Sequence, residues 1–180
     1  MGYLENIKIH AGVQKRVEII FSQAVEEDFI ERFKEYKNVS FEIVNSAEEL
    51  ASEVDVFISC ITNAQDLLVP NEKSFKRGVT VIPVHMRGLQ NCDTTFDRVF
   101  GDDTAHVCGF KLFKQWPDYN EIGEVLNGRD PGRKSDVQRI IDYNYGLALH
   151  DVVFAAKIYE LLKDESQDIK IERETAKFWV

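Results

Sequence analysis

The stretch Val54–Ile61 (VDVFISCI) decides the fold, because nearly every residue after Asp55 is apolar. A near-continuous apolar run of this length is what a parallel strand buried on both faces requires. Comparable short runs predict further strands: Val17–Phe21 (VEIIF), Val39–Val44 (VSFEIV), Val79–Val84 (VTVIPV), Asp97–Phe100 (DRVF) and Arg139–Tyr143 (RIIDY). The chain therefore contains enough strands for one sheet.

The segments between these strands have helical signals. Val25, Phe29, Ile30 and Phe33 recur at helical spacing and predict a helix from 25 to 36. Ser46, with Glu49 three residues later, has the pattern of a capping box. Further helices are predicted over 70–76, ending at Gly78, over 119–126, and over 146–163. Strands that alternate with helices predict an α/β fold with a mostly parallel sheet, flanking helices and a long C-terminal helix.

Composition limits the classes of partner. The chain has 180 residues, 44% of them apolar, which suits one packed domain. Its net charge of −9 disfavours nucleic acid and anionic membranes, and no apolar run is long enough for a membrane span. The start has no signal-peptide pattern, so we expect a cytoplasmic protein.

The cysteines fit the same expectation. There are three, widely spaced, which is neither a disulfide framework nor a metal-binding pattern. Cys60 lies in the Val54–Ile61 strand and is predicted to be an inert core thiol. Cys92 lies in a polar loop and is predicted to be the most exposed of the three.

Three segments, taken together, resemble the ornithine cyclodeaminase/mu-crystallin family. They are VDVFISCIT (54–62), the stretch from Gly78 to Asp103, and IGEVLNGRDPGR (122–133) continuing into DYNYGLALHDVVFAAKIY (142–159). The third is the most specific, because the family has a similar helix, glycine, PGR-type turn, strand and GLA-type helix in this order. The resemblance covers roughly residues 17 to 163. It implies a single truncated Rossmann-like, NAD(P)-binding-type domain over 1–164, followed by a charged tail over 165–180.

The resemblance also implies a chemistry. Family members transfer hydride between NAD or NADP and an amine or imine carbon, and in the lyase members ammonia loss and ring closure follow. The implied substrate is a small amino acid or imine. Such an enzyme needs a substrate domain, which a homodimer or a partner chain would have to supply here. It also needs a glycine-rich phosphate turn, yet Gly12 is followed by the VEIIF strand with no room for a helix between them.

Candidate site residues follow the predicted strands. Ser22 stands where a dinucleotide-binding domain places an acid on the ribose, and Thr62 ends the strand under the cofactor. Arg87 falls where the family's general acid/base aspartate is expected, and a guanidinium cannot take up a proton. His85 and Asp93 are the nearest titratable groups and are weak catalytic candidates. Ser22, Thr62, His85 and Arg87 are candidate cofactor ligands, although each could equally be an ordinary turn residue.

No metal site is predicted. Asp102 and Asp103 could hold a divalent ion, but adjacent carboxylates are more often a helix N-cap and its neighbour.

Because the substrate domain, the glycine-rich turn and the catalytic aspartate are not found, we predict a catalytically incompetent relative that keeps the fold. A non-catalytic nucleotide-binding or protein-interaction module, or a fragment of a longer enzyme, remains an alternative. The sequence does not distinguish NAD from NADP or name the substrate.

Overall fold

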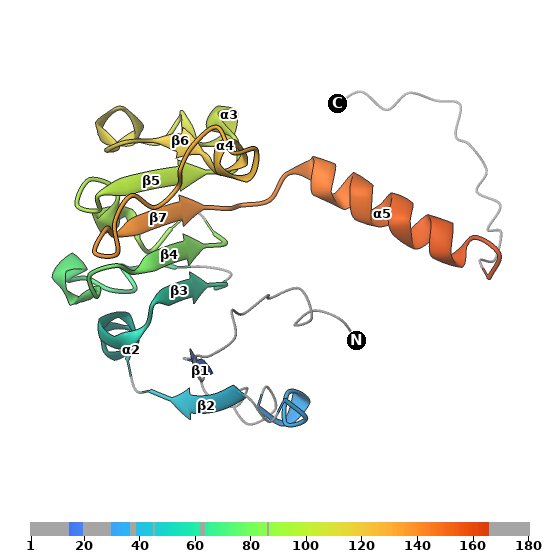
Figure 1. The fold of residues 1–180 in the computed structure, drawn as a ribbon, viewed down its shortest axis with the longest axis horizontal. Helices are drawn as coiled ribbons and strands as arrows, with labels where there is room; N and C mark the ends of the chain where they lie inside the picture. Colours follow the sequence, from blue (N-terminus) through green and yellow to red (C-terminus); the bar gives the residue numbers. More distant parts are fainter. Residues whose placement is uncertain are drawn as a thin grey trace. The chain divides into compact units, whose positions relative to one another are not determined.

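The structure is a computed structural model that describes residues 15–19, 30–36, 39–44, 46–61, 64–85 and 87–165 (Figure 1). The chain divides into two compact units, residues 1–145 and 146–180, which are described separately here. In the first unit, β1 (Lys15–Ile19) and β2 (Val39–Ile43) form a parallel pair in which Lys15 lies opposite Val39. β1 thus begins two residues before the predicted strand. Most of the predicted 25–36 helix lies outside the described residues.

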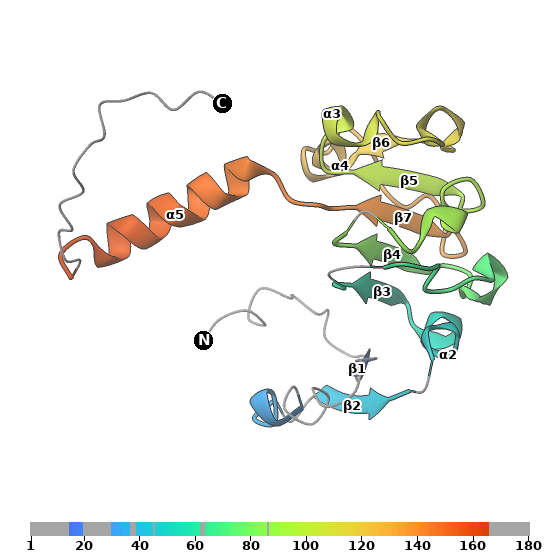
Figure 2. The same ribbon diagram turned by 180° about the vertical axis from the view of Figure 1, so that it is seen from behind.

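A second sheet has five strands. They are β3 (Val56–Ser59), β4 (Thr80–Pro83), β5 (Arg98–Gly101), β6 (Asn120–Glu121) and β7 (Ile140–Tyr143). Their order is β3-β4-β7-β5-β6, and every pair is parallel. Both views show the arrows in this order and pointing the same way (Figures 1 and 2). The predicted α/β fold with a mostly parallel sheet is confirmed.

Short helices and turns connect the strands, and local signals explain where they begin. The Ser46 hydroxyl accepts a 3.1 Å hydrogen bond from Glu49 N and caps α2 (Ala47–Glu53), as predicted. Asp103 caps α3 (Thr104–Val107) with its side chain, which favours the cap over the metal site. α4 spans Ile122–Leu126 and directly follows β6.

The predicted helix over 70–76 is wrong, because this segment forms only one 3₁₀ turn over Glu72–Ser74. Two further 3₁₀ turns span Gln90–Cys92 and Phe113–Gln115. Gly78 does end the segment, with φ +83°, and a Cβ atom there would lie 2.2 Å from the Asp136 carbonyl oxygen. Only glycine combines that conformation with so close a backbone neighbour.

The hydrophobic core lies against one face of the five-stranded sheet. Phe57, Val81, Val99 and Ile141 point into it from four neighbouring strands. Phe75 packs edge-to-face on Phe57 at a centroid distance of 5.4 Å and continues the core beyond the sheet. Leu50, Phe96 and Val107 join the same cluster. Burial of this shared apolar face is the main force that holds the unit together.

The opposite face is covered unevenly. Ile140 and Phe100 are buried on β7 and β5, whereas Val56 and Ile58 on β3 are each more than half exposed. The prediction that the VDVFISCI strand is buried on both faces is therefore wrong. β3 is the edge strand of this sheet and alternates between exposed and buried residues.

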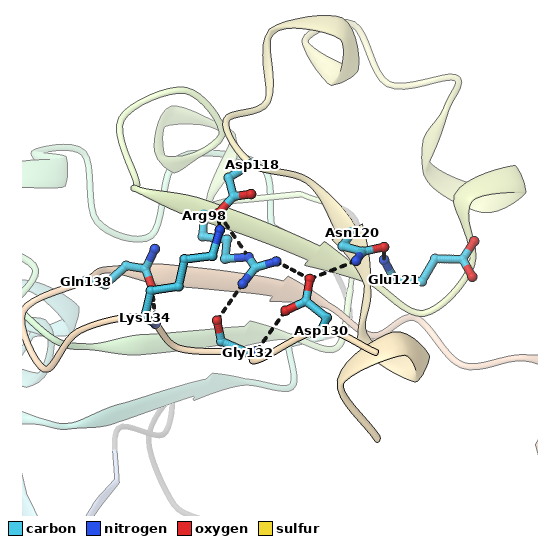
Figure 3. A network of polar contacts seen from close by, with 8 residues as sticks. All are labelled: Arg98, Asp118, Asn120, Glu121, Asp130, Gly132, Lys134 and Gln138. Atoms are coloured by element: carbon cyan, nitrogen blue, oxygen red, sulfur yellow. Dashed lines mark hydrogen bonds and ion pairs between the residues drawn. The ribbon is translucent and has the colours of Figure 1, made fainter. Parts of the chain in front are cut away.

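The turn from Arg129 to Gln138 packs on the face of the sheet that carries Phe100 and Ile140. It lies near the amino ends of the strands. Arg98, only 2% exposed, donates to the Gly132 carbonyl and the Asp130 carboxylate and pairs with Asp118 (Figure 3). The Asn120 amide also donates to Asp130, at 2.8 Å. The Asn120 hydrogen bond, followed by the Arg98 hydrogen bond, lowers the pKa of Asp130 to about 2, although burial opposes both.

The second unit contains α5 (Ala148–Leu162), so the predicted long C-terminal helix over 146–163 is confirmed with slightly shorter ends. Apolar residues occur on every side of this helix, so no single apolar stripe stands out. No helix among the described residues is long and apolar enough to cross a membrane. Residues 166–180 of the predicted tail lie outside the described residues, and the proposed boundary between 164 and 165 stays a prediction.

Candidate functional site

The carboxyl ends of all five parallel strands lie at one edge of the sheet. Ligands of open α/β sheets bind at this edge, because the loops that follow the strands are free to vary there. Four of the loops carry titratable groups, after β3, β4, β5 and β7. The candidate site therefore begins with the residues in those loops.

Ser59 and His85 meet at this edge. Ser59 is the last residue of β3 and His85 follows β4, and the two strands are paired. The Ser59 Oγ lies 2.5 Å from His85 Nε2, and Ser59 is only 6% exposed. Burial lowers the pKa of His85 below its ordinary value, and a hydrogen bond with the Arg87 backbone opposes that shift. His85 is thus held neutral near pH 7 and joined to a buried hydroxyl.

A shallow depression of about 240 Å³ is formed by residues that follow Ser59 and His85 in the sequence. Its lining comes from residues 64–67, after β3, and from Arg87, Gly88 and Gln90, after β4. Gly88 brings the two loops together, because a Cβ at this position, where φ is +105°, would lie 2.8 Å from the Ala64 Cβ. Leu68 N donates to the Gly88 carbonyl at 2.8 Å and fixes the contact. Arg87 and Asp66 place opposite charges on the rim.

Asp93, a predicted catalytic candidate, is buried instead of facing this depression. It accepts a hydrogen bond from the Tyr143 hydroxyl, and Tyr143 stacks on Trp116 at a centroid distance of 5.2 Å. Burial raises the pKa of Asp93, while the hydrogen bond from Tyr143 opposes the increase. This carboxyl ties the loop after β4 to the end of β7, and its burial favours a structural role.

Asp142 was not singled out from the sequence. It lies in β7, is 7% exposed, and its Oδ1 has no hydrogen-bond partner among the described residues. Burial raises its pKa to about 6, Asn144 lowers it by a side-chain hydrogen bond, and the nearby Asp102 carboxylate raises it further. The only sequence signal was an acid inside an apolar strand, RIIDY, where an ionised group is costly.

The remaining predicted site residues are not brought together. Ser22 and Thr62 lie outside the described residues, so their cofactor roles stay predictions. No cluster of three metal-ligating side chains exists among the residues that the structure describes. Both cysteine predictions are wrong. Cys60 is exposed because β3 ends at Ser59, and Cys92 is buried because its 3₁₀ turn faces the core. Burial raises the pKa of the Cys92 thiol, so it is unreactive.

Comparisons with known proteins agree with this architecture. The nodulation efficiency protein NfeD of Rhizobium meliloti is 29% identical over 126 residues, 66% of this chain and 39% of that protein. A Thermococcus litoralis Δ1-pyrroline-2-carboxylate reductase, solved in complex with NADH and L-proline, matches 84% of this chain with a TM-score of 0.68 and 16% identity. An ornithine cyclodeaminase of Bordetella pertussis, described as probable, matches 82% of it with a TM-score of 0.65 and 20% identity.

The chain spans about half the length of these two solved proteins, 51% of each. At such identities the likeness concerns the fold, which is that of the Rossmann domain of these enzymes. The family model of the ornithine cyclodeaminase/mu-crystallin family matches residues 101–166, the region that holds the third and most specific of the three resembling segments. Over this region, from the end of β5 through α5, the chain matches the ornithine cyclodeaminase/mu-crystallin family in sequence.

Proposed function

We propose that the chain is a nucleotide-binding domain of an NAD(P)(H)-linked protein acting on a small amino acid or imine. On its own it binds the nucleotide without turning substrate over. The observation that carries this proposal is the depression between the loops after β3 and β4, at the carboxyl edge of a parallel sheet. The fold likeness to a reductase solved with NADH supports it.

The residues in the depression fit part of a dinucleotide. Arg87 supplies a cation for a phosphate group, and Asp66 supplies a carboxylate that can accept hydrogen bonds from ribose hydroxyls. A volume of about 240 Å³ is small beside the roughly 300–1,000 Å³ of sites that enclose a whole ligand. We therefore assign a phosphate and ribose to the depression, with the rest of the cofactor lying along the sheet edge.

The same residues argue against turnover. Arg87 occupies the position at which the family resemblance places the proton-transferring aspartate, and a guanidinium stays protonated at neutral pH. The nearest downstream acid, Asp93, is buried under Tyr143 and Trp116. Neither group can exchange a proton with a substrate in the depression.

The proposal is tested by titrating the folded chain with NADH and NADPH while following tryptophan fluorescence. Saturable binding below about 100 μM, roughly −5.5 kcal/mol, is expected. Arg87→Ala should weaken binding several-fold, while Arg129→Ala, which removes an exposed arginine that pairs with Glu124 and does not line the depression, should not. No binding up to millimolar cofactor would contradict the proposal. Oxidation of NADH by a cyclic imine would contradict the incompetence of the isolated chain.

A further inference from the structure

The Ser59–His85 pair has the geometry of a nucleophile and its base. The Ser59 hydroxyl lies 2.5 Å from His85 Nε2, which is hydrogen-bond distance. The contact with the Arg87 backbone raises the pKa of His85, so it favours the charged imidazole. Its backbone partner must then be an acceptor, the Arg87 carbonyl.

A base at this position requires one of the two tautomers. Nε2 faces Ser59, and in the tautomer with the proton on Nδ1 that proton is available to the Arg87 backbone, the contact that raises the pKa of His85. Nε2 is then unprotonated and accepts the Ser59 hydroxyl proton. A serine, a histidine and a third group that orients the histidine are the three parts of a nucleophilic site, here with a carbonyl as the orienting group.

The surroundings suit a base near neutral pH. Ser59 is nearly buried, which keeps water from competing for its hydrogen bond to the imidazole. The burial that lowers the pKa of His85 leaves it in the neutral, proton-accepting form. The residues next to the pair in sequence, Cys60, Ile61 and Val84, are exposed, so the pair lies close to the surface at the carboxyl ends of the strands.

We propose that Ser59 is a nucleophile, with His85 as its general base, that accepts acyl groups from small activated esters. In the first step Ser59 Oγ attacks the ester carbonyl carbon and its proton moves to His85 Nε2. The tetrahedral adduct expels the alcohol oxygen, which takes the proton from Nε2, and the acyl group stays on Ser59. Water then attacks the acyl carbon through the same base, which releases the carboxylic acid and restores the Ser59 hydroxyl.

The test is labelling with diisopropyl fluorophosphate, which phosphorylates activated serines and avoids the exposed thiols of Cys60 and Cys108. The full chain is incubated at pH 7.5, and the adduct is located by mass spectrometry of the intact protein and its peptides. One adduct, on Ser59, is expected. Its rate should be full at pH 7.5 and fall as pH decreases through the lowered pKa of His85.

Two variants separate activation from mere exposure. His85→Gln keeps a side chain that can hydrogen bond to Ser59 but cannot take up a proton, so labelling should slow at least tenfold. Ser52→Ala removes a hydroxyl on α2 that donates to the Glu49 carbonyl, and it should label like the parent chain. Circular dichroism of each variant shows that it is folded.

The proposal is overturned if the folded parent chain gains no adduct on Ser59, or if labelling is equally fast in His85→Gln and independent of pH. The parent chain's pH profile decides the matter even if a variant misfolds. This inference does not rest on nucleotide binding. Failure to bind NADH leaves the labelling result standing, and failure to label leaves the titration standing.

Discussion

The amino and carboxyl ends of the strands in the five-stranded sheet differ in how their buried ionisable groups are paired. At the amino end, Arg98 is buried among Asp118, Asp130 and the Gly132 carbonyl, and its charge is matched by carboxylates on both sides (Figure 3). At the carboxyl end, Asp142 is buried with an oxygen that has no partner among the described residues, and His85 is held neutral. The pKa of Asp130 falls to about 2, while that of Asp142 rises to about 6.

This difference separates stability from function. A buried cation that is paired with carboxylates holds a turn in place, whereas a buried carboxylate with no cation beside it costs stability. The PGR-type turn is the most specific part of the family resemblance. Its contacts with Arg98 hold it against the sheet, so its main role is structural. At the carboxyl ends of the strands, by contrast, polar groups are left that a ligand could bind.

The largest effect is expected at the amino end. Arg98→Ala should destabilise the chain by about 3 kcal/mol, because it removes the buried guanidinium that donates to the Asp130 carboxylate and the Gly132 carbonyl. Urea unfolding measures the loss. Arg129→Ala is the matched control, since its pair with Glu124 is exposed to solvent and should contribute little to stability. Equal losses in the two variants would show that the Arg98 cluster is not a structural lock.

At the carboxyl end the sign should reverse. Asp142→Asn removes a buried charge, so we expect it to stabilise the chain by about 1–3 kcal/mol at pH 8. Between the ordinary carboxyl pKa near 4 and the folded value of about 6, the folded state binds more protons than the unfolded state. Stability of the parent chain should therefore fall as pH rises through this window. Thermal unfolding from pH 4 to 8 should show a larger fall in the parent than in the variant, which keeps only the smaller contribution of Asp93. A variant that melts lower than the parent at pH 8 would contradict it.

The same comparison shows what the sequence could and could not predict. The Ser46 cap was predicted correctly because it depends on a neighbour three residues away. The Arg98–Asp130 pair joins residues 32 apart, and nothing local marks either as a partner of the other. Burial of Cys92 and exposure of Cys60 were predicted the wrong way round for the same reason. Which face of a turn meets the core is decided by packing and not by the local sequence.

The site divides in the same way. His85 and Arg87 could be named as candidates because they follow a recognisable strand, and ligands of open α/β sheets bind beyond the carboxyl ends of the strands. The partner of His85, Ser59, was hidden inside an apolar run and came from the neighbouring strand. Only the pairing of β3 with β4, in which Ser59 lies opposite Pro83, brings it within reach of the loop after β4.

A smaller effect should appear in acid. The lowered pKa of Asp130 contributes stability above the ordinary carboxyl pKa near 4, and this stability is lost as pH falls toward 2. Asp130→Asn should therefore lose less of its remaining stability than the parent chain over this range. Urea midpoints at pH 4, 3 and 2 measure the slope. Parallel slopes in both proteins would show that the amino-end carboxylate is not preferentially stabilised in the folded state.

The smallest effect on stability, and the sharpest on function, is expected from Arg87→Ala. Arg87 is exposed and lines the depression, so its removal should change the free energy of unfolding by no more than about 0.5 kcal/mol. Without this cation beside the phosphate, NADH should nevertheless bind several-fold more weakly, and the remaining affinity should depend less on salt. Stability and affinity that fell together would place Arg87 with the structural residues of the amino end. Affinity falling alone would assign the carboxyl edge to the ligand.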